Sequence, residues 1–204
     1  MGEITSFTER TKASLREALL DAATDLLPDR GYAALRMADV AARAGVSRQT
    51  VYNEFGNKAA LAQAVALRTA SEFLEGIKQR LCDAESLPIA IHRAVVYTIE
   101  HARENRLVAA ALGTEAGEDL LPLLTTKGEP ILTASVELAA EQYREFEPGL
   151  STGSAVLLAE TVVRLSLSHL VLPTHSAAEA ADAVTAVLTP AIRQLATTDP
   201  VTTE

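Results

Sequence analysis

The chain of 204 residues contains no tryptophan, four phenylalanines, four tyrosines and a single cysteine, Cys82. One cysteine excludes an intramolecular disulfide and a multi-thiolate metal site, and it fits a reducing compartment. No basic segment followed by an apolar run opens the sequence, so we expect no signal peptide. The longest apolar stretch, residues 155–172, is interrupted by Glu160, Arg164 and His169. Charged groups are costly in a bilayer, so we predict a buried helix and a cytoplasmic protein.

The acidic charge is unevenly distributed along the chain. The formal charge is −9, yet residues 1–58 hold eight basic and eight acidic side chains, which leaves the whole excess in residues 59–204. A neutral segment can present a basic face to a phosphate backbone while an acidic remainder keeps the protein soluble. The net charge therefore does not exclude nucleic acid as a partner.

Helical periodicity runs through nearly the whole sequence. Asn-Gly and Asp-Gly turns are absent, and no clear run of alternating β-branched residues occurs, which predicts an all-α fold. In the first part, Pro28 and Gly31 are expected to end the first helix, Gly45 to supply a turn, and Ser47 and Asn57 to cap the helices that follow them. The predicted helices cover residues 8–27, 36–44, 47–55, 58–81, 88–104, 106–112, 119–125, 130–147, 152–172 and 177–195.

The chain is long enough for one ordinary domain or for a small head on a larger body, and we expect a three-helix head in residues 1–57 and a helical body in residues 58–204. The segment GYAALRMADVAARAGVSRQTVYNEFGNKAAL, residues 31–61, resembles the DNA-binding head of the tetracycline-repressor (TetR) family. That family's pattern is Gly-aromatic, a short helix ending Ile/Val-Ala, an Ala-Gly-Val-Ser turn, then Tyr, Phe and Asn/Ser-Lys. The family has Thr or Ser before the first short helix, whereas this chain has Leu35 and Arg36. Either the N-cap and a hydroxyl contact with phosphate are lost there, or Arg36 supplies a cationic contact instead.

The helix after Gly45 carries the side chains that we expect to meet DNA. A helix-turn-helix inserts its second helix into the major groove with the N-terminal residues nearest the base edges. We assign Gln49 and Asn53 to bases, and Arg48, the Tyr52 hydroxyl and Lys58 to phosphates. The complete predicted DNA-binding set is Arg36, Ser47, Arg48, Gln49, Thr50, Tyr52, Asn53 and Lys58.

The last two long helices are apolar nearly all round, so one face of each helix can cover the core while the other needs a partner. Two such helices from each of two copies would form a four-helix interface, as the resemblance also implies. The sequence therefore predicts a homodimer, with interface residues Val156, Val163, Leu167, Val184 and Leu188.

The body holds no recognisable catalytic pattern. Its four histidines lack the spacing of a helical metal pair, and neither a Gly-rich phosphate loop nor a nucleophile elbow occurs, so we expect no enzyme, metal or cofactor. Abundant Ala, Leu and Val with few aromatics indicate a cavity for a small lipophilic effector such as an acyl chain. The candidate polar residues of this cavity are His92, Tyr97, His101, Tyr143 and His169.

These features favour a ligand-responsive transcriptional regulator. We expect a repressor that binds a palindromic DNA operator as a dimer and is released by a small apolar effector. The alternative, from another functional class, is an all-α small-molecule-binding or catalytic protein whose head does not recognise DNA.

Overall fold

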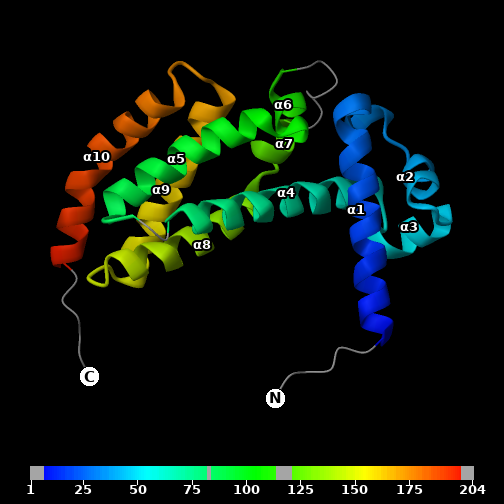
Figure 1. Ribbon diagram of the computed structural model, residues 1–204, viewed down its shortest axis with the longest axis horizontal. Coiled ribbons are helices and arrows are strands. Elements are labelled where there is room, and N and C mark those ends of the chain that lie inside the picture. The colour runs from blue at the N-terminus through cyan, green and yellow to red at the C-terminus, as the bar shows by residue number, and fades with distance from the viewer. Residues whose placement is uncertain (1–6, 82–83, 114–120, 199–204) are drawn as a thin grey trace. The chain divides into compact units, whose positions relative to one another are not determined.

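The computed structural model describes residues 7–81, 84–113 and 121–198, and the regular elements among these residues are all helices (Figure 1). The predicted all-α class is confirmed, and Cys82 lies outside the described residues. The helices are α1 (Phe7–Ala34), α2 (Met37–Ala44), α3 (Arg48–Phe55), α4 (Lys58–Leu81), α5 (Leu87–Glu104), α6 (Arg106–Gly113), α7 (Leu121–Leu124), α8 (Glu129–Phe146), α9 (Thr152–Val171) and α10 (Ala177–Thr198).

Contacts within the chain group the residues into two units. The head unit extends to Arg68 and also includes the segment from Arg106 to Leu123, whereas the body unit comprises Thr69–Asn105 and the residues from Leu124 onward. The sequence predicts this division after residue 57. The two divisions differ because the first half of α4 is bonded to α1 through Arg68, and because α6 packs on α1.

The head unit is built around the buried face of α1. Leu19 and Ala23 of α1 are fully buried, as are Val40 of α2 and Val51 of α3, and Phe55 is nearly so. In Figure 1, α2 and α3 lie together on one side of α1. Burying these apolar side chains fixes the short helices, because eight-residue helices are not stable by themselves in water.

The first helix is longer than predicted. It continues past Pro28 to Ala34, with non-helical backbone at Gly31, where φ is 70°. Proline and a left-handed glycine indicate a helix end, yet the chain resumes helical geometry for the last residues after this kink. The predicted end at residue 27 is therefore wrong, and Gly31 marks the break.

The helix caps read from the sequence are present. Asn57 accepts a hydrogen bond from the Ala60 amide at 2.9 Å. Ser176 and Glu179 form the expected capping box before α10, where each side chain accepts from the other residue's amide, at 2.9 Å and 3.3 Å. The hydrogen bonds from the Ser176 amide and hydroxyl hold the pKa of Glu179 below its ordinary value.

The body unit has one hydrophobic core, to which α5, α8, α9 and α10 contribute. The α8–α9 pair and the α5–α10 pair make the most extensive helix contacts of the unit, and α9 also packs on α5 and α10. Ile91 and Val95 of α5 and Ala155 and Ala159 of α9 are fully buried at this centre. By length and composition α9 could cross a membrane, but its buried face is part of this core.

Candidate DNA-binding surface

The turn between α2 and α3 has the geometry that the sequence predicts. Gly45 adopts the left-handed conformation, with φ 70° and ψ 28°, and its amide donates to Ala42 O, while the Val46 amide donates to Ala41 O at 2.9 Å. These two bonds form a Schellman motif. A residue with a Cβ at position 45 would be strained in this left-handed conformation, which favours glycine. The Ser47 hydroxyl then accepts from the Thr50 amide at 3.1 Å, which caps α3 as predicted.

The two faces of α3 differ sharply in character. Val51 and Phe55 are buried in the head unit, whereas Arg48, Gln49 and Asn53 are exposed. Thr50 and Tyr52 are half-buried at the edge between the two faces. The structure thus brings together on one surface the residues that the sequence analysis assigned to DNA on this helix.

The exposed side chains of α3 are held in two pairs, each four residues apart. The Arg48 guanidinium donates to the Tyr52 hydroxyl at 3.2 Å and lies 5.1 Å from the centre of its ring. Gln49 Nε2 donates to Asn53 Oδ1 at 2.9 Å. The first pair offers a cation with a hydroxyl, which suits phosphate, and the second retains amide donors and an acceptor, which suit base edges.

Arg36 occupies the N-cap position of α2. Its backbone is extended, its side chain makes no capping hydrogen bond, and the residue is exposed. A guanidinium has no hydrogen-bond acceptor, so it cannot cap the amides of Met37 and Ala38, while the Asp39 amide donates to Arg36 O at 3.0 Å. A cation beside free helix-terminal amides suits an anion such as phosphate.

The Lys58 ammonium binds inside the head unit. It donates to the carbonyl oxygens of Tyr32 at 2.9 Å and Ala33 at 3.1 Å, and it lies 4.4 Å from the centre of the Tyr32 ring. From the sequence, this ammonium is expected to contact a phosphate. The structure instead gives it three partners within the protein.

Other arginines of the head unit are held by carboxylates. Arg16 pairs with Glu54 at 2.8 Å, Arg30 with Asp39 at 2.5 Å, and Arg43 with Asp25. These carboxylates offset the charge of these three arginines. Of the three basic residues predicted to contact DNA, Arg36 and Arg48 are exposed, whereas Lys58 is held by carbonyls of the head unit.

The predicted ligand-binding residues lie in different places within the body unit. Tyr97 and His101 are stacked, with ring centres 4.9 Å apart, and Phe73 lies 5.0 Å from the His101 ring. His92 is bonded to Asp182 of α10 at 3.0 Å instead.

Tyr143 and His169 make up the rest of the predicted ligand set. Tyr143 is buried in the core, and this burial raises its pKa above the ordinary value. His169 is half-buried in α9. Of the five predicted residues, the structure therefore brings only Tyr97 and His101 into ring contact.

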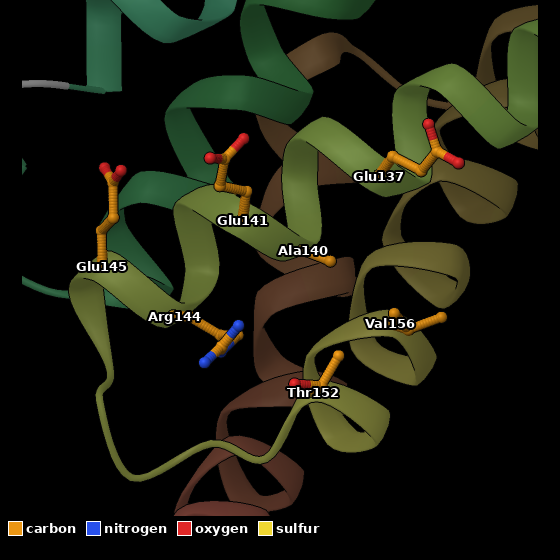
Figure 2. Close-up of a pocket in the computed structure, with 7 residues that line it drawn as sticks. All are labelled: Glu137, Ala140, Glu141, Arg144, Glu145, Thr152 and Val156. Carbon is orange, nitrogen blue, oxygen red and sulfur yellow. The ribbon is translucent and has the colours of Figure 1, made fainter.

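A groove of about 590 Å³ lies between α8 and α9. Figure 2 shows Arg144 of α8 and Thr152 of α9 facing each other there, while the carboxylates of Glu141 and Glu145 extend away from Thr152. The groove is open and also includes Glu137, Ala140 and Val156. An open groove edged by carboxylates does not suit an enclosed acyl chain, and it contains none of the residues predicted for the effector.

Family profiles match both parts of the sequence. Residues 19–65 match the family described as bacterial regulatory proteins, tetR family, and residues 87–190 match the bacterial tetracyclin repressor C-terminal domain. The HTH-type transcriptional regulator AlkX of Mycobacterium tuberculosis is 32% identical over 185 residues, which cover 90% of this chain and 88% of that protein. The chain belongs to the TetR family of transcriptional regulators.

Two further relatives extend this result. The crystal structure of the TetR family repressor AlkX from Dietzia sp., implicated in biodegradation of n-alkanes, has a TM-score of 0.74 and 28% identity. The matched region includes 89% of this chain and 96% of the Dietzia chain. The transcriptional activator FasR of Mycolicibacterium smegmatis is 41% identical over 66 residues, which are 32% of this chain and 30% of that protein.

The predicted interface residues of this TetR-family chain differ in exposure. Val156 is 39% exposed, and Val163 and Leu167 are half-buried in α9. Val184 and Leu188, by contrast, are 3% and 6% exposed and belong to the core of the body unit. Their assignment to an interface is corrected, because they face the chain's own core.

Sequence reasoning missed the most exposed apolar side chains of the two helices. Leu157 of α9 is 60% exposed and Val187 of α10 is 70% exposed. A helix that is apolar nearly all round does not reveal which face its own core covers. Glu160 and Arg164, one helical turn apart, form an ion pair on α9 at 2.7 Å.

Proposed function

We propose that this TetR-family regulator binds a palindromic operator as a homodimer, represses transcription, and is released from DNA by a small apolar effector. The observation that carries the proposal is the surface of α3, where a capped helix presents Arg48, Gln49 and Asn53 to solvent while its other face is buried. Because the proposed operator is chromosomal DNA, we place the protein in the cytoplasm. The relatives favour this function over the alternative of an all-α binding or catalytic protein.

The contact roles follow from the two side-chain pairs on α3. We assign Gln49 and Asn53 to base edges, because a paired amide still offers donors and an acceptor in one plane. Arg48 and Tyr52 are assigned to phosphate, and Arg36 is assigned to a second phosphate at the start of α2. Ser47 and Thr50 support these residues through the cap of α3 and stand at the same edge.

The proposed dimer uses the exposed faces of α9 and α10. Val156, Leu157 and Val187 are large apolar side chains that this chain leaves exposed, and Val163 and Leu167 are only partly covered. Pairing these faces with a second copy would bury them in a four-helix arrangement. Two copies also supply the two recognition helices that a palindromic site requires.

The direction of regulation and the effector class rest on the relatives and on composition. The Dietzia protein is a repressor implicated in n-alkane biodegradation, and its similarity extends over most of this chain. The activator FasR matches only about a third of the chain, so it bears on the DNA-binding part alone. Together with the Ala-, Leu- and Val-rich body, this favours a repressor that senses a lipophilic molecule such as an acyl chain.

A nuclease footprint tests the DNA-binding part of the proposal. Purified protein on the DNA upstream of its own gene should protect two symmetric half-sites whose centres are separated by about 34–36 Å, or a multiple of that distance. The double variant Gln49→Ala/Asn53→Ala serves as the matched control and should lose this footprint while keeping its helical content. Absence of any protected site for the wild-type protein would refute the proposal.

Calorimetry tests the effector part. Medium- and long-chain acyl compounds are titrated into the protein with and without operator. Linkage requires that a ligand which weakens operator binding must itself bind the DNA complex more weakly by the same factor. A lipophilic ligand that binds equally well in both cases would show that its site is not regulatory.

A further inference from the structure

The exposed face of α9 carries two charged side chains in an otherwise apolar helix. Apart from His169, Glu160 and Arg164 are the only ionisable residues in the helix. They lie one helical turn apart, and their side chains are 42% and 61% exposed. An exposed ion pair contributes little to stability, so the folding of a single chain gives weak reason for this placement.

Large apolar side chains flank the ion pair on the same face of α9. Leu157 is 60% exposed and Val156 is 39% exposed before the pair, and Leu167 is half-buried after it. At 3.6 residues per turn, these three side chains lie on the side of the pair, opposite the buried Ala155 and Val162. A partner that covers the apolar side chains therefore also covers the ion pair between them.

The order of the two charges suits a partner that is a second copy of this chain. A two-fold axis brings residue i of one copy against residue j of the other, and j against i. If two α9 helices cross in an antiparallel sense midway between Glu160 and Arg164, each Glu160 meets the partner's Arg164. The same axis places Leu157 against the partner's Leu167, so apolar side chains meet apolar side chains.

The geometry of the pair leaves hydrogen-bonding groups for such a partner. Nε of Arg164 donates to Oε1 of Glu160 at 2.8 Å, and Nη2 lies 2.7 Å from the same oxygen. A guanidinium has five N–H groups and a carboxylate has two oxygens. The second oxygen and the remaining N–H groups can therefore bind their counterparts across the axis while the bonds within each copy are kept.

We propose that Glu160 and Arg164 lie inside the homodimer interface and pair across its two-fold axis, so that they select a second copy of this chain in one register. The inference rests on the homodimer of the proposed function. Charged pairs in an interface give specificity more than affinity, because removing them from water offsets much of their attraction. The apolar faces then supply the affinity, and a helix with another order of charges is rejected because it leaves buried charges unpaired.

Charge reversal at one position per chain tests this pairing. Glu160→Arg gives a chain with two cations on the face, and Arg164→Glu gives a chain with two anions. We expect each variant alone to dimerise about a hundredfold or more weakly than wild type, because like charges then meet in the interface. Mixed in equal amounts, the two variants should form heterodimers almost exclusively, which native mass spectrometry distinguishes by mass from either homodimer.

Two controls separate this effect from misfolding and from net charge. The double variant Glu160→Arg/Arg164→Glu again has one charge of each sign, and it should dimerise as the wild type does. Glu100→Arg and Arg103→Glu make the same changes of charge at exposed positions of α5. Each of these two chains should dimerise as the wild type does, and their mixture should contain the statistical share of heterodimers.

The outcomes distinguish this inference from the rest of the proposed function. Wild-type-like homodimers from both reversed chains, or a statistical mixture of the two, would show that the pair stays on a solvated face and would overturn the inference alone. Monomeric wild-type protein would overturn the proposed dimer together with it. Charge-selected heterodimers from a protein that shows no preference for its upstream DNA would support the inference and refute operator binding.

Discussion

Ordering a long polar side chain on binding costs conformational entropy, and on α3 four exposed or half-buried polar side chains are already held by one another in the absence of DNA. Gln49 is bonded to Asn53 and Arg48 to Tyr52, each pair one helical turn apart. Long polar side chains lose rotamer freedom when they bind, so pairing in the free protein reduces that loss. In the proposed function, the residue pairs, more than any single residue, are therefore the units that would meet DNA on this surface.

Substitution of Gln49 by alanine tests its base-reading role. If Gln49 reads a base, Gln49→Ala should lose roughly 1–3 kcal/mol on the preferred operator, relax preference at one base pair, and leave binding to random DNA nearly unchanged. Quantitative binding to a panel of single-base operator variants measures this. Equal losses on operator and random DNA would reassign Gln49 to the phosphate backbone.

Burial of Tyr143 predicts an alkaline limit on stability. Its folded pKa is raised by burial above the unfolded value of about 10, so the protonated folded state is favoured fully below that pH, and the stabilisation is lost as pH rises beyond it. Urea unfolding at pH 9 and pH 11 should show a loss of up to about 1.4 kcal/mol from this group. Tyr143→Phe should show a smaller loss over the same interval, and an identical loss in both proteins would contradict the burial.

At the scale of helices, local signals in the sequence predicted most of what the structure shows. The helix-turn-helix follows from Gly45 and Ser47, whose roles are set by backbone conformation and by one capping bond. The continuation of α1 beyond Pro28 was not predicted, because Pro28 and Gly31 are both local signals of a helix end, and helical geometry resumes after the break at Gly31. Likewise, the partners of Lys58 come from another element, and no local pattern specifies them.

Gly76 of α4 lies close to Tyr97 of α5, so replacing this glycine by alanine should change stability in the direction opposite to the usual one. A Cβ at Gly76 would lie 2.9 Å from Cζ of Tyr97 and closer still to its hydroxyl, and Tyr97 is stacked on His101. Alanine in place of glycine within a helix normally stabilises by roughly 0.5–1 kcal/mol. Gly76→Ala should instead destabilise by roughly 1–3 kcal/mol, because the ring must leave its stacking partner.

Urea unfolding measures this change, with Gly153→Ala on α9 as the matched control. The Cβ added at Gly153 meets nothing closer than 3.9 Å, so that variant should be stabilised. Adding Tyr97→Leu to Gly76→Ala should recover part of the loss. If Gly76→Ala instead stabilised the protein, the position of the Tyr97 ring would not require a glycine at residue 76.

At the scale of the whole molecule, the sequence predicts a homodimer, and the structure changes which residues of α9 and α10 would form its interface. Val184 and Leu188 face the core, whereas Leu157 and Val187 are exposed on the same two helices. The sequence could not distinguish them, because both faces of α10 are apolar and only packing against α5 and α9 decides which is covered.

The exposed residues give the sharper test of dimerisation. Leu157→Glu and Val187→Glu should each shift the protein toward monomer in analytical ultracentrifugation, because a charge would have to be buried without a partner. Operator affinity should fall with dimerisation, since both half-sites must be held together. Ile89→Glu on α5, also at an exposed apolar position, is the control and should stay dimeric. Wild-type protein that sediments as a monomer at micromolar concentration would contradict the interface.

The central claim is that this chain recognises one DNA sequence, and competition binding tests it most directly. A labelled duplex from the upstream region is bound at physiological salt and then challenged either with the same unlabelled duplex or with a scrambled duplex of equal length and composition. Specific regulators prefer their site by about a thousandfold or more, so the scrambled duplex should be needed at a concentration higher by at least that factor. Equal competition by the two duplexes would mean that the polar face of α3 grips DNA without reading it, and the account would be wrong.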